Sequence, residues 1–136
     1  MEQLIKMIAK MSNFHMEEDM TNKLVISEEG VGGIERLILT INIGLLTLLE
    51  EKALSIEEAE NYIYSPYSES YLKRLDVNPQ ILDLIISGCQ LEDFESLLPH
   101  KLFDKIHVMK TESINIYKTL KRPLIPTKKW IDMQDQ

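Results

Sequence analysis

Apolar side chains recur at helical spacing along most of the chain, and the longest such stretch runs from Ile34 to Lys52. It contains no proline and consists mostly of residues that favour helices. Leucine and isoleucine fall on all sides of the expected helix, and a helix that is apolar all round is usually buried all round. We therefore predict a central buried helix over residues 34–52. Within it Asn42 needs a hydrogen-bonding partner, and Gly44 indicates that another helix crosses closely.

Helix start and stop signals divide the rest of the chain. Ser55 and Glu58 have the spacing of a capping box, in which each side chain bonds the backbone N–H of the other residue. Asn78 followed by proline predicts a second start, and Gly88 is the expected C-cap of that helix. The helices expected after the central one are 55–64, 68–75, 79 to the cap at Gly88, 91–98 and 100–121.

These patterns predict an all-α fold, an irregular bundle of five to six helices around a central buried helix. A chain of 136 residues fits one domain. We expect a partly ordered N-terminal segment over residues 1–33, a helical domain over 34–122 and a basic tail over 123–136. The predicted inner face of the last helix is Leu102, Phe103, Ile106, Met109 (or Lys110), Ser113, Ile116 (or Tyr117) and Leu120.

The charges are distributed unevenly. Residues 1–104 hold 8 Lys or Arg and 19 Asp or Glu, a net charge of −11, whereas residues 105–136 hold 7 and 3, a net charge of +4. An acidic body repels nucleic-acid phosphates and attracts basic proteins. The basic end could fold back on this body or contact phosphate, and the first arrangement is the preferred one.

Features of the sequence also bear on location. The first residues lack the basic flank, continuous apolar region and cleavage site of a signal peptide. The longest uncharged, mostly apolar run, Leu37 to Leu49, has 13 residues, against about 20 for a membrane-spanning helix. The single cysteine, Cys89, permits no intramolecular disulfide. We therefore expect a cytoplasmic protein without a membrane partner.

Two stretches carry a resemblance to a known family. Residues 88–99 read Gly-Cys-Gln-Leu-Glu-Asp-Phe-Glu-Ser-Leu-Leu-Pro, and residues 55–62 read Ser-Ile-Glu-Glu-Ala-Glu-Asn-Tyr, ahead of Pro66. Both are similar to segments of a family of small bacterial helical proteins catalogued only as a domain of unknown function. The resemblance covers roughly residues 34–122. It implies a bacterial source and a helical domain, and it implies no activity.

No constellation of residues predicts catalysis. His100, Asp104 and His107 share one face of the last expected helix, and they are weak metal candidates because lysines flank them and a fourth ligand is missing. Cys89 lacks an evident base and orienting group. The glycines of residues 30–33 depart from the dinucleotide-binding spacing and have no P-loop lysine, so they read as a hinge. We expect no catalytic residue, no bound metal and no cofactor.

A surface for a protein partner is the better-supported candidate site. Two expected helix starts are rich in carboxylates, which a helix N-terminus stabilises as anions. Between them, four tyrosines surround Pro66, and tyrosine is enriched at binding hot spots. The residues predicted to bind a partner are Glu57, Glu58, Tyr62, Tyr67, Tyr71, Glu92 and Asp93.

Three functions remain open on the sequence. The leading prediction is a non-enzymatic protein-interaction module, of the immunity or antitoxin type, that inhibits a basic bacterial protein; a homo-oligomer is also compatible with the sequence. The second is a small nucleic-acid-binding regulator, and the third is a metal-dependent enzyme. The second would use the basic end of the chain, namely Lys118, Lys121, Arg122, Lys128 and Lys129 with Trp130.

Overall fold

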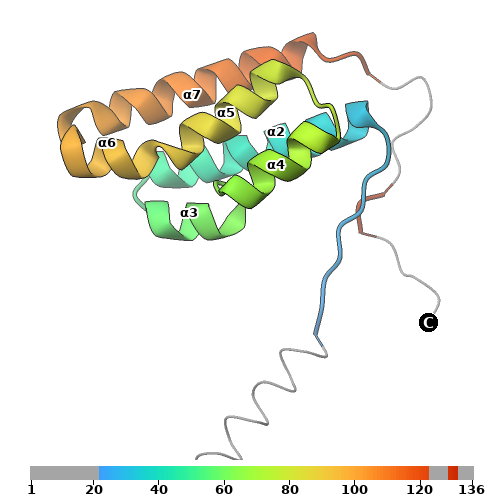
Figure 1. The fold of residues 1–136 in the computed structure, drawn as a ribbon, viewed down its shortest axis with the longest axis horizontal. Coiled ribbons are helices and arrows are strands. Elements are labelled where there is room, and N and C mark those ends of the chain that lie inside the picture. Colours follow the sequence, from blue (N-terminus) through green and yellow to red (C-terminus); the bar gives the residue numbers. More distant parts are fainter. Residues whose placement is uncertain (1–21, 123–128, 132–136) are drawn as a thin grey trace, which may run out of the picture. The chain divides into compact units, whose positions relative to one another are not determined.

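The computed structural model describes residues 22–122 and 129–131 (Figure 1). All regular secondary structure in these two ranges is helical, so the all-α prediction is confirmed for the described residues. Residues 1–21 of the expected N-terminal segment and most of the expected basic tail lie outside the described residues.

The chain divides into two compact units. One combines Met1–Ser27 with Lys129–Gln136, and the other is Glu28–Lys128. In the described part of the first unit, the backbone N–H of Ser27 donates to the carbonyl oxygen of Trp130 at 3.4 Å. All helices of the described residues belong to the second unit.

The second unit contains helices of two sizes. Four described helices have nine or more residues, and α3 and α6 have seven each. The expected count of five to six is therefore reached only with these two-turn helices included, and there are four main helices. Both short helices are limited by a proline that follows them. The bounds are α2 Val31–Glu50, α3 Ile56–Tyr62, α4 Pro66–Arg74, α5 Pro79–Cys89, α6 Leu91–Leu97 and α7 Pro99–Thr119.

Side-chain caps set several of the helix starts. The predicted capping box begins α3, where the backbone N–H of Glu58 donates to Ser55 Oγ at 3.1 Å and the Glu58 carboxylate accepts from the Ser55 N–H at 3.4 Å. The predicted Asn78 cap also begins α5, because its Oδ1 accepts from the backbone N–H of Gln80. Helix α4 begins earlier than expected, since Ser65 caps it and proline supplies its first residue.

We expect Ser55→Ala to lower the free energy of unfolding by about 1 kcal/mol, because it removes the N-cap of α3. Urea denaturation measures this change. Ser70→Ala is the matched control, since Ser70 is exposed within α4 and should change stability much less. Equal effects for the two variants would show that the cap contributes nothing.

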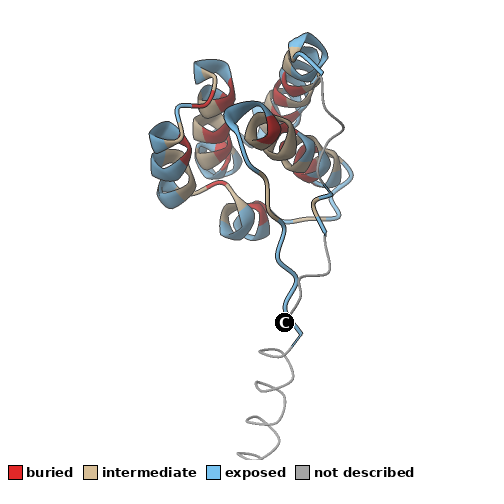
Figure 2. Cartoon of the chain, turned by 90° about the vertical axis from the view of Figure 1, so that its right-hand side faces the viewer, coloured by how far each residue is buried: buried red, intermediate tan, exposed pale blue. Residues whose placement is uncertain are grey.

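Helix α7 makes the most extensive contacts with other helices. It lies along α2 on one side and contacts α5 and α6 on the other (Figure 1). Buried residues gather where the helices face one another, and exposed residues cover the outside (Figure 2). The core residues are Leu39, Leu45, Leu46, Leu49, Ile56, Ala59, Tyr64, Leu72, Val77, Ile81, Leu84, Ile85, Leu91, Ile106 and Met109.

The prediction that the central helix is buried all round is wrong. Thr40, Gly44 and Leu48 form an exposed line on the outer side of α2, because α7 and the core cover only the opposite side. The helix also begins at Val31 rather than at residue 34. The expected hinge is thus reduced to Gly30, whose φ of 81° favours glycine.

By length and composition alone, α2 is apolar enough to cross a membrane, although a core helix of a globular protein passes the same test. In the second unit it serves as a core helix. Its buried residues include Leu39, Leu45, Leu46 and Leu49. The carboxylate of Glu35, also on α2, accepts a hydrogen bond of 2.6 Å from the backbone N–H of Asn78.

Neither of two glycines has the role predicted for it. No atom lies within 4 Å of a Cβ built on Gly44, so no described helix crosses there. Gly88 is not the cap of α5, which ends at Cys89 with Gln90 as its C-cap. Gly88 is buried inside the helix, where a Cβ would overlap the ring of Tyr64. The close approach that demands a glycine therefore involves α5.

The predicted partner of Asn42 is present. Its Nδ2 donates to Ser113 Oγ at 2.8 Å, and its Oδ1 accepts from the hydroxyl of Tyr64. Ser113 Oγ in turn donates to the carbonyl oxygen of Met109 at 2.7 Å. This buried chain of hydrogen bonds links α2, Tyr64 in the connection between α3 and α4, and α7.

Candidate functional site

The two acidic helices lie against each other. Helices α3 and α6 are separated along the chain by α4 and α5, yet they are in contact. Glu60 of α3 faces Glu92 of α6, and Glu57 and Glu95 lie close enough to act on it electrostatically. We call these four residues the carboxylate cluster. Burial, followed by the charge of Glu92 and then of the other two, raises the pKa of Glu60.

Local packing holds the cluster in place. Ala59 on α3 and Leu91 on α6 are fully buried, so each short helix turns one side to the core. The opposite sides then carry the carboxylates, and Glu57, Glu92 and Glu95 are exposed. Like charges held together in this way repel one another, and a cation that binds among them relieves that repulsion.

Glu60→Gln should raise the free energy of unfolding at about pH 7 and change it little at about pH 3. The pKa of Glu60 is higher in the folded state. The stability that Glu60 contributes is therefore fully present below the pKa that Glu60 has in the unfolded chain. It is lost as the pH rises through the higher pKa that Glu60 has in the folded protein. Urea denaturation at both pH values measures the difference. Exposed Glu112→Gln on α7 controls for the loss of one negative charge, and an equal gain there would contradict the expectation.

An apolar groove of about 770 Å³ borders the carboxylate cluster. Its floor is apolar, and Glu50, Glu58 and Glu95 lie on its walls together with Lys52. We call it the α3–α7 groove. Its lining comes from the end of α2, the connection to α3, the start of α3, α6 and the start of α7: Leu49, Glu50, Lys52, Ala53, Leu54, Ser55, Ile56, Glu58, Glu95, Pro99, Leu102, Phe103 and Ile106.

Phe103 occupies an unexpected position in this groove. The sequence places it on the inner face of the last helix, whereas 58% of its surface is exposed. Ile106 and Met109 are buried as predicted. The inner-face prediction fails at Phe103 because among the described residues no element covers the groove. Leu97, the last residue of α6 and six residues before Phe103 in the sequence, is also exposed, with 75% of its surface accessible.

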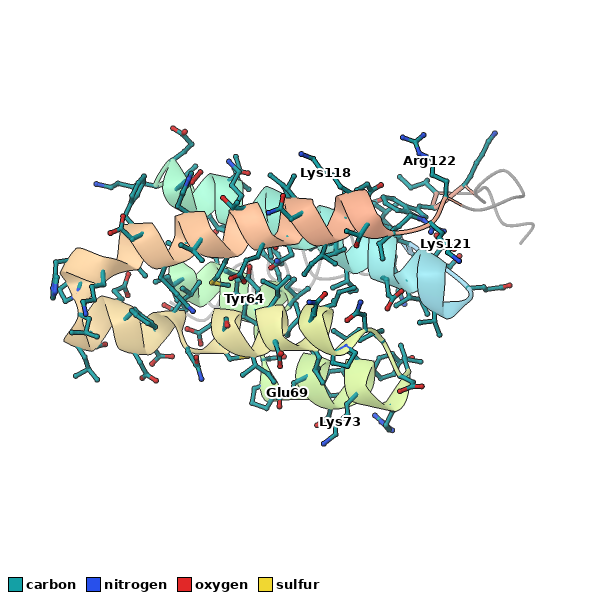
Figure 3. The ribbon with its side chains drawn as sticks, turned by 90° about the horizontal axis from the view of Figure 1, so that it is seen from above. Tyr64, Glu69, Lys73, Lys118, Lys121 and Arg122 are labelled. Carbon is teal, nitrogen blue, oxygen red and sulfur yellow. The ribbon has the colours of Figure 1, made fainter. Side chains whose placement is uncertain are left out.

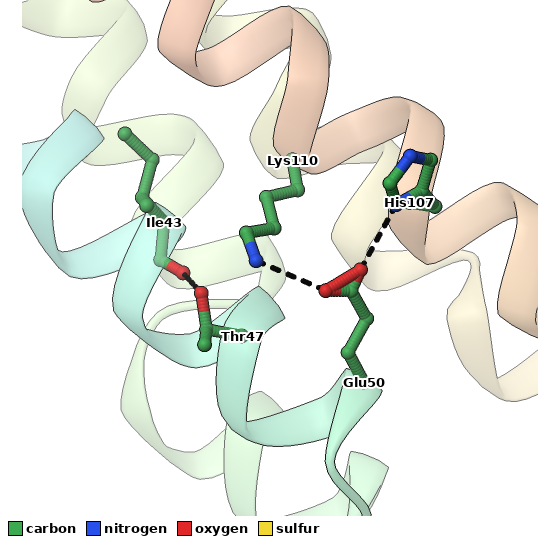
Figure 4. Close-up of polar contacts among 5 residues, drawn as sticks. All are labelled: Ile43, Thr47, Glu50, His107 and Lys110. Carbon is green, nitrogen blue, oxygen red and sulfur yellow. Dashed lines mark hydrogen bonds and ion pairs between the residues drawn. The ribbon is translucent and has the colours of Figure 1, made fainter.

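Glu50, which lines the groove, is paired with two side chains of α7 (Figure 4). The carboxylate of Glu50 contacts His107 Nδ1 at 3.1 Å and Lys110 Nζ at 3.0 Å, joining the end of α2 to the middle of α7. These two contacts lower the pKa of Glu50. They also offset the unfavourable placement of an anion at a helix C-terminus.

The predicted partner-binding tyrosines Tyr62, Tyr67 and Tyr71 are exposed. Tyr67 and Tyr71 of α4 stack with ring centroids 6.3 Å apart, and Arg74 lies over the Tyr71 ring. Tyr62 is exposed on α3, whereas Tyr64 is only 2% exposed. The tyrosines are absent from the lining of the α3–α7 groove.

The surroundings of the weak metal candidates His100, Asp104 and His107, and of Cys89, do not favour a metal site or a nucleophile. His107 is paired with Glu50, while His100 and Asp104 are exposed. Among the described residues, no group of three or more His, Cys, Asp or Glu side chains could hold a metal ion. Burial and the charges of Glu69 and Glu60 raise the pKa of Cys89, which disfavours the nucleophilic thiolate.

The basic residues at the end of α7 lie far along the bundle from α6 (Figure 3). Lys118, Lys121 and Arg122 are exposed there, and Arg36 Nη1 donates to the carbonyl oxygen of Lys121 at 3.2 Å. The second unit therefore carries its carboxylate cluster and these cations at different places. Lys129 belongs to the first unit, and Lys128 lies outside the described residues.

Of the predicted acidic residues, Glu57 and Glu92 belong to the cluster, and Glu58 lines the groove beside it. Asp93 is exposed on α6. The sequence contains no signal for Phe103 as a site residue, whereas Glu60 and Glu95 lie in the two carboxylate-rich helix starts expected to form a partner surface. The acidic runs contain the two glutamates, but only the contact between α3 and α6 shows that they share a surface.

Comparisons with known proteins identify the family without an activity. Searches of curated proteins and of solved structures gave no match. A family model described as "Protein of unknown function (DUF3969)" matches residues 29–132. The chain therefore belongs to this family of proteins of unknown function.

Proposed function

We propose that the protein is a non-enzymatic interaction module that binds a basic protein through the carboxylate cluster of α3 and α6. The observation that carries the proposal is the contact between two acidic helices from different parts of the chain. Their mutual repulsion costs folding free energy, and a cationic partner would offset that cost.

The net charge supports the same function. The whole chain carries a charge of −7, so its field steers basic proteins toward it and slows the approach of nucleic acids. A small cytoplasmic inhibitor of the immunity or antitoxin type suits these properties, because such an inhibitor needs a binding surface and no catalytic group.

The experiment is capture of partners from the cell that makes the protein, with bound proteins identified by mass spectrometry. We expect a basic protein to be retained at about 50 mM salt and released at about 500 mM, since salt screens exposed charges. The variant Glu57→Gln/Glu92→Gln should retain less of it. Asp83→Asn/Glu112→Gln removes two exposed negative charges elsewhere and should behave like the wild type.

Two results would refute this function. One is the absence of any retained protein at low salt. The other is a retained protein that both double variants capture as well as the wild type does. Retention of nucleic acid in place of protein, abolished by neutralising Lys118 and Arg122, would favour the regulator function predicted from the basic end.

A further inference from the structure

The α3–α7 groove offers a neighbouring partner both apolar contact and negative charge. Leu49, Ile56 and Ile106 are almost completely buried at its base. Above them, Phe103 exposes more than half of its surface. An exposed aromatic ring beside an apolar floor is typical of a hot spot that receives an anchor side chain.

The charges on the groove are predominantly negative. Glu58 and Glu95 line it, against the single lysine Lys52, and the third carboxylate of the lining, Glu50, is already paired with Lys110 and His107. Glu95 also acts on Glu60, so the groove is continuous with the carboxylate cluster. An occupant that matches both properties has an apolar side for the floor and cations at its edges.

We propose that the α3–α7 groove receives an amphipathic, lysine- or arginine-rich helix of the partner protein, with an apolar anchor beside Phe103. This inference rests on the proposed function and names the partner's chemistry. An amphipathic helix suits the groove because its apolar residues, spaced at i, i+3, i+4 and i+7, form one narrow row. Its cations then lie along both sides of that row, against Glu58 and Glu95.

The test uses the full chain and a fluorescent synthetic peptide of about 18 residues, with leucines at that helical spacing and lysines elsewhere. Fluorescence anisotropy measures its binding. We expect Phe103→Ser to weaken binding by about thirtyfold, the loss at which a residue counts as a hot spot. Tyr117→Ser is the matched control, because Tyr117 is a 41% exposed aromatic of the same helix outside the groove, and it should bind like the wild type.

Charge is tested separately. Glu95→Lys should weaken binding by about tenfold or more, whereas Glu112→Lys, on exposed α7 surface outside the groove, should have a much smaller effect. A peptide with glutamate in place of lysine should not bind. Equal binding of the acidic and basic peptides would overturn the proposal.

Other results would refute the groove as the binding site without refuting the proposed function. If Glu57→Gln/Glu92→Gln weakens peptide binding and Phe103→Ser does not, the groove is wrong while the cluster keeps its function. If the peptide does not bind the wild type, the groove proposal fails, and the capture experiment still decides the function. A wild-type dimer in sedimentation that Phe103→Ser converts to a monomer would assign the groove to a second copy of the chain and overturn the proposal.

Discussion

Gly88→Ala is expected to destabilise the protein by about 3 kcal/mol, whereas Gly44→Ala should stabilise it by up to about 1 kcal/mol. A Cβ on Gly88 would overlap the ring of Tyr64, and that ring is buried and hydrogen-bonded to Asn42. The ring therefore cannot move aside without breaking the bond. Gly44 has open space around it, so alanine there adds only helix propensity.

Urea denaturation of the two variants gives this comparison directly. Each variant adds one methyl group to a glycine inside a helix, so the pair is matched in chemistry. Similar effects of the two substitutions would contradict the close approach of α5 to Tyr64.

Asn42→Leu should lower the free energy of unfolding by about 2–3 kcal/mol. It removes the acceptor of the Tyr64 hydroxyl and the donor to Ser113 Oγ, both of which are buried. The larger share of the cost comes from Tyr64, because Ser113 retains its bond to Met109. A buried hydroxyl without a partner costs more than the same site filled by an apolar group.

A second substitution isolates that cost. Tyr64→Phe removes the unpaired hydroxyl, so Asn42→Leu/Tyr64→Phe should be more stable than Asn42→Leu alone. The coupling between the two positions should be about 1 kcal/mol, as for residues in one hydrogen-bond network. Strictly additive losses in denaturation experiments would show that the two side chains do not share a bond.

The features predicted correctly from the sequence are mostly local. The cap residues Ser55 and Asn78 act on N–H groups two or three residues away, so their spacing along the chain contains the needed information. The all-α class follows from helical spacing in the same way. The need of Asn42 for a partner was also predictable, since a buried amide must be satisfied, but its actual partners were not.

The features that were missed depend on contacts between distant segments. Gly44 and Gly88 are both glycines within apolar helices, and only the position of Tyr64 shows which of them is in close contact. Phe103 belongs to the apolar pattern of α7, but burial requires a covering element, and none of the described helices covers the groove. The carboxylate cluster needs α4 and α5 to bring α6 back to α3.

Binding of a basic partner by the carboxylate cluster is tested most directly by titration calorimetry with the purified captured protein. For the wild type, we expect the affinity to fall by about tenfold or more between about 50 and 500 mM salt. Glu57→Gln/Glu92→Gln should bind more weakly at low salt and lose less affinity as salt rises, while Asp83→Asn/Glu112→Gln should follow the wild type. The same affinity and the same salt dependence for all three proteins would contradict a role of α3 and α6 in binding.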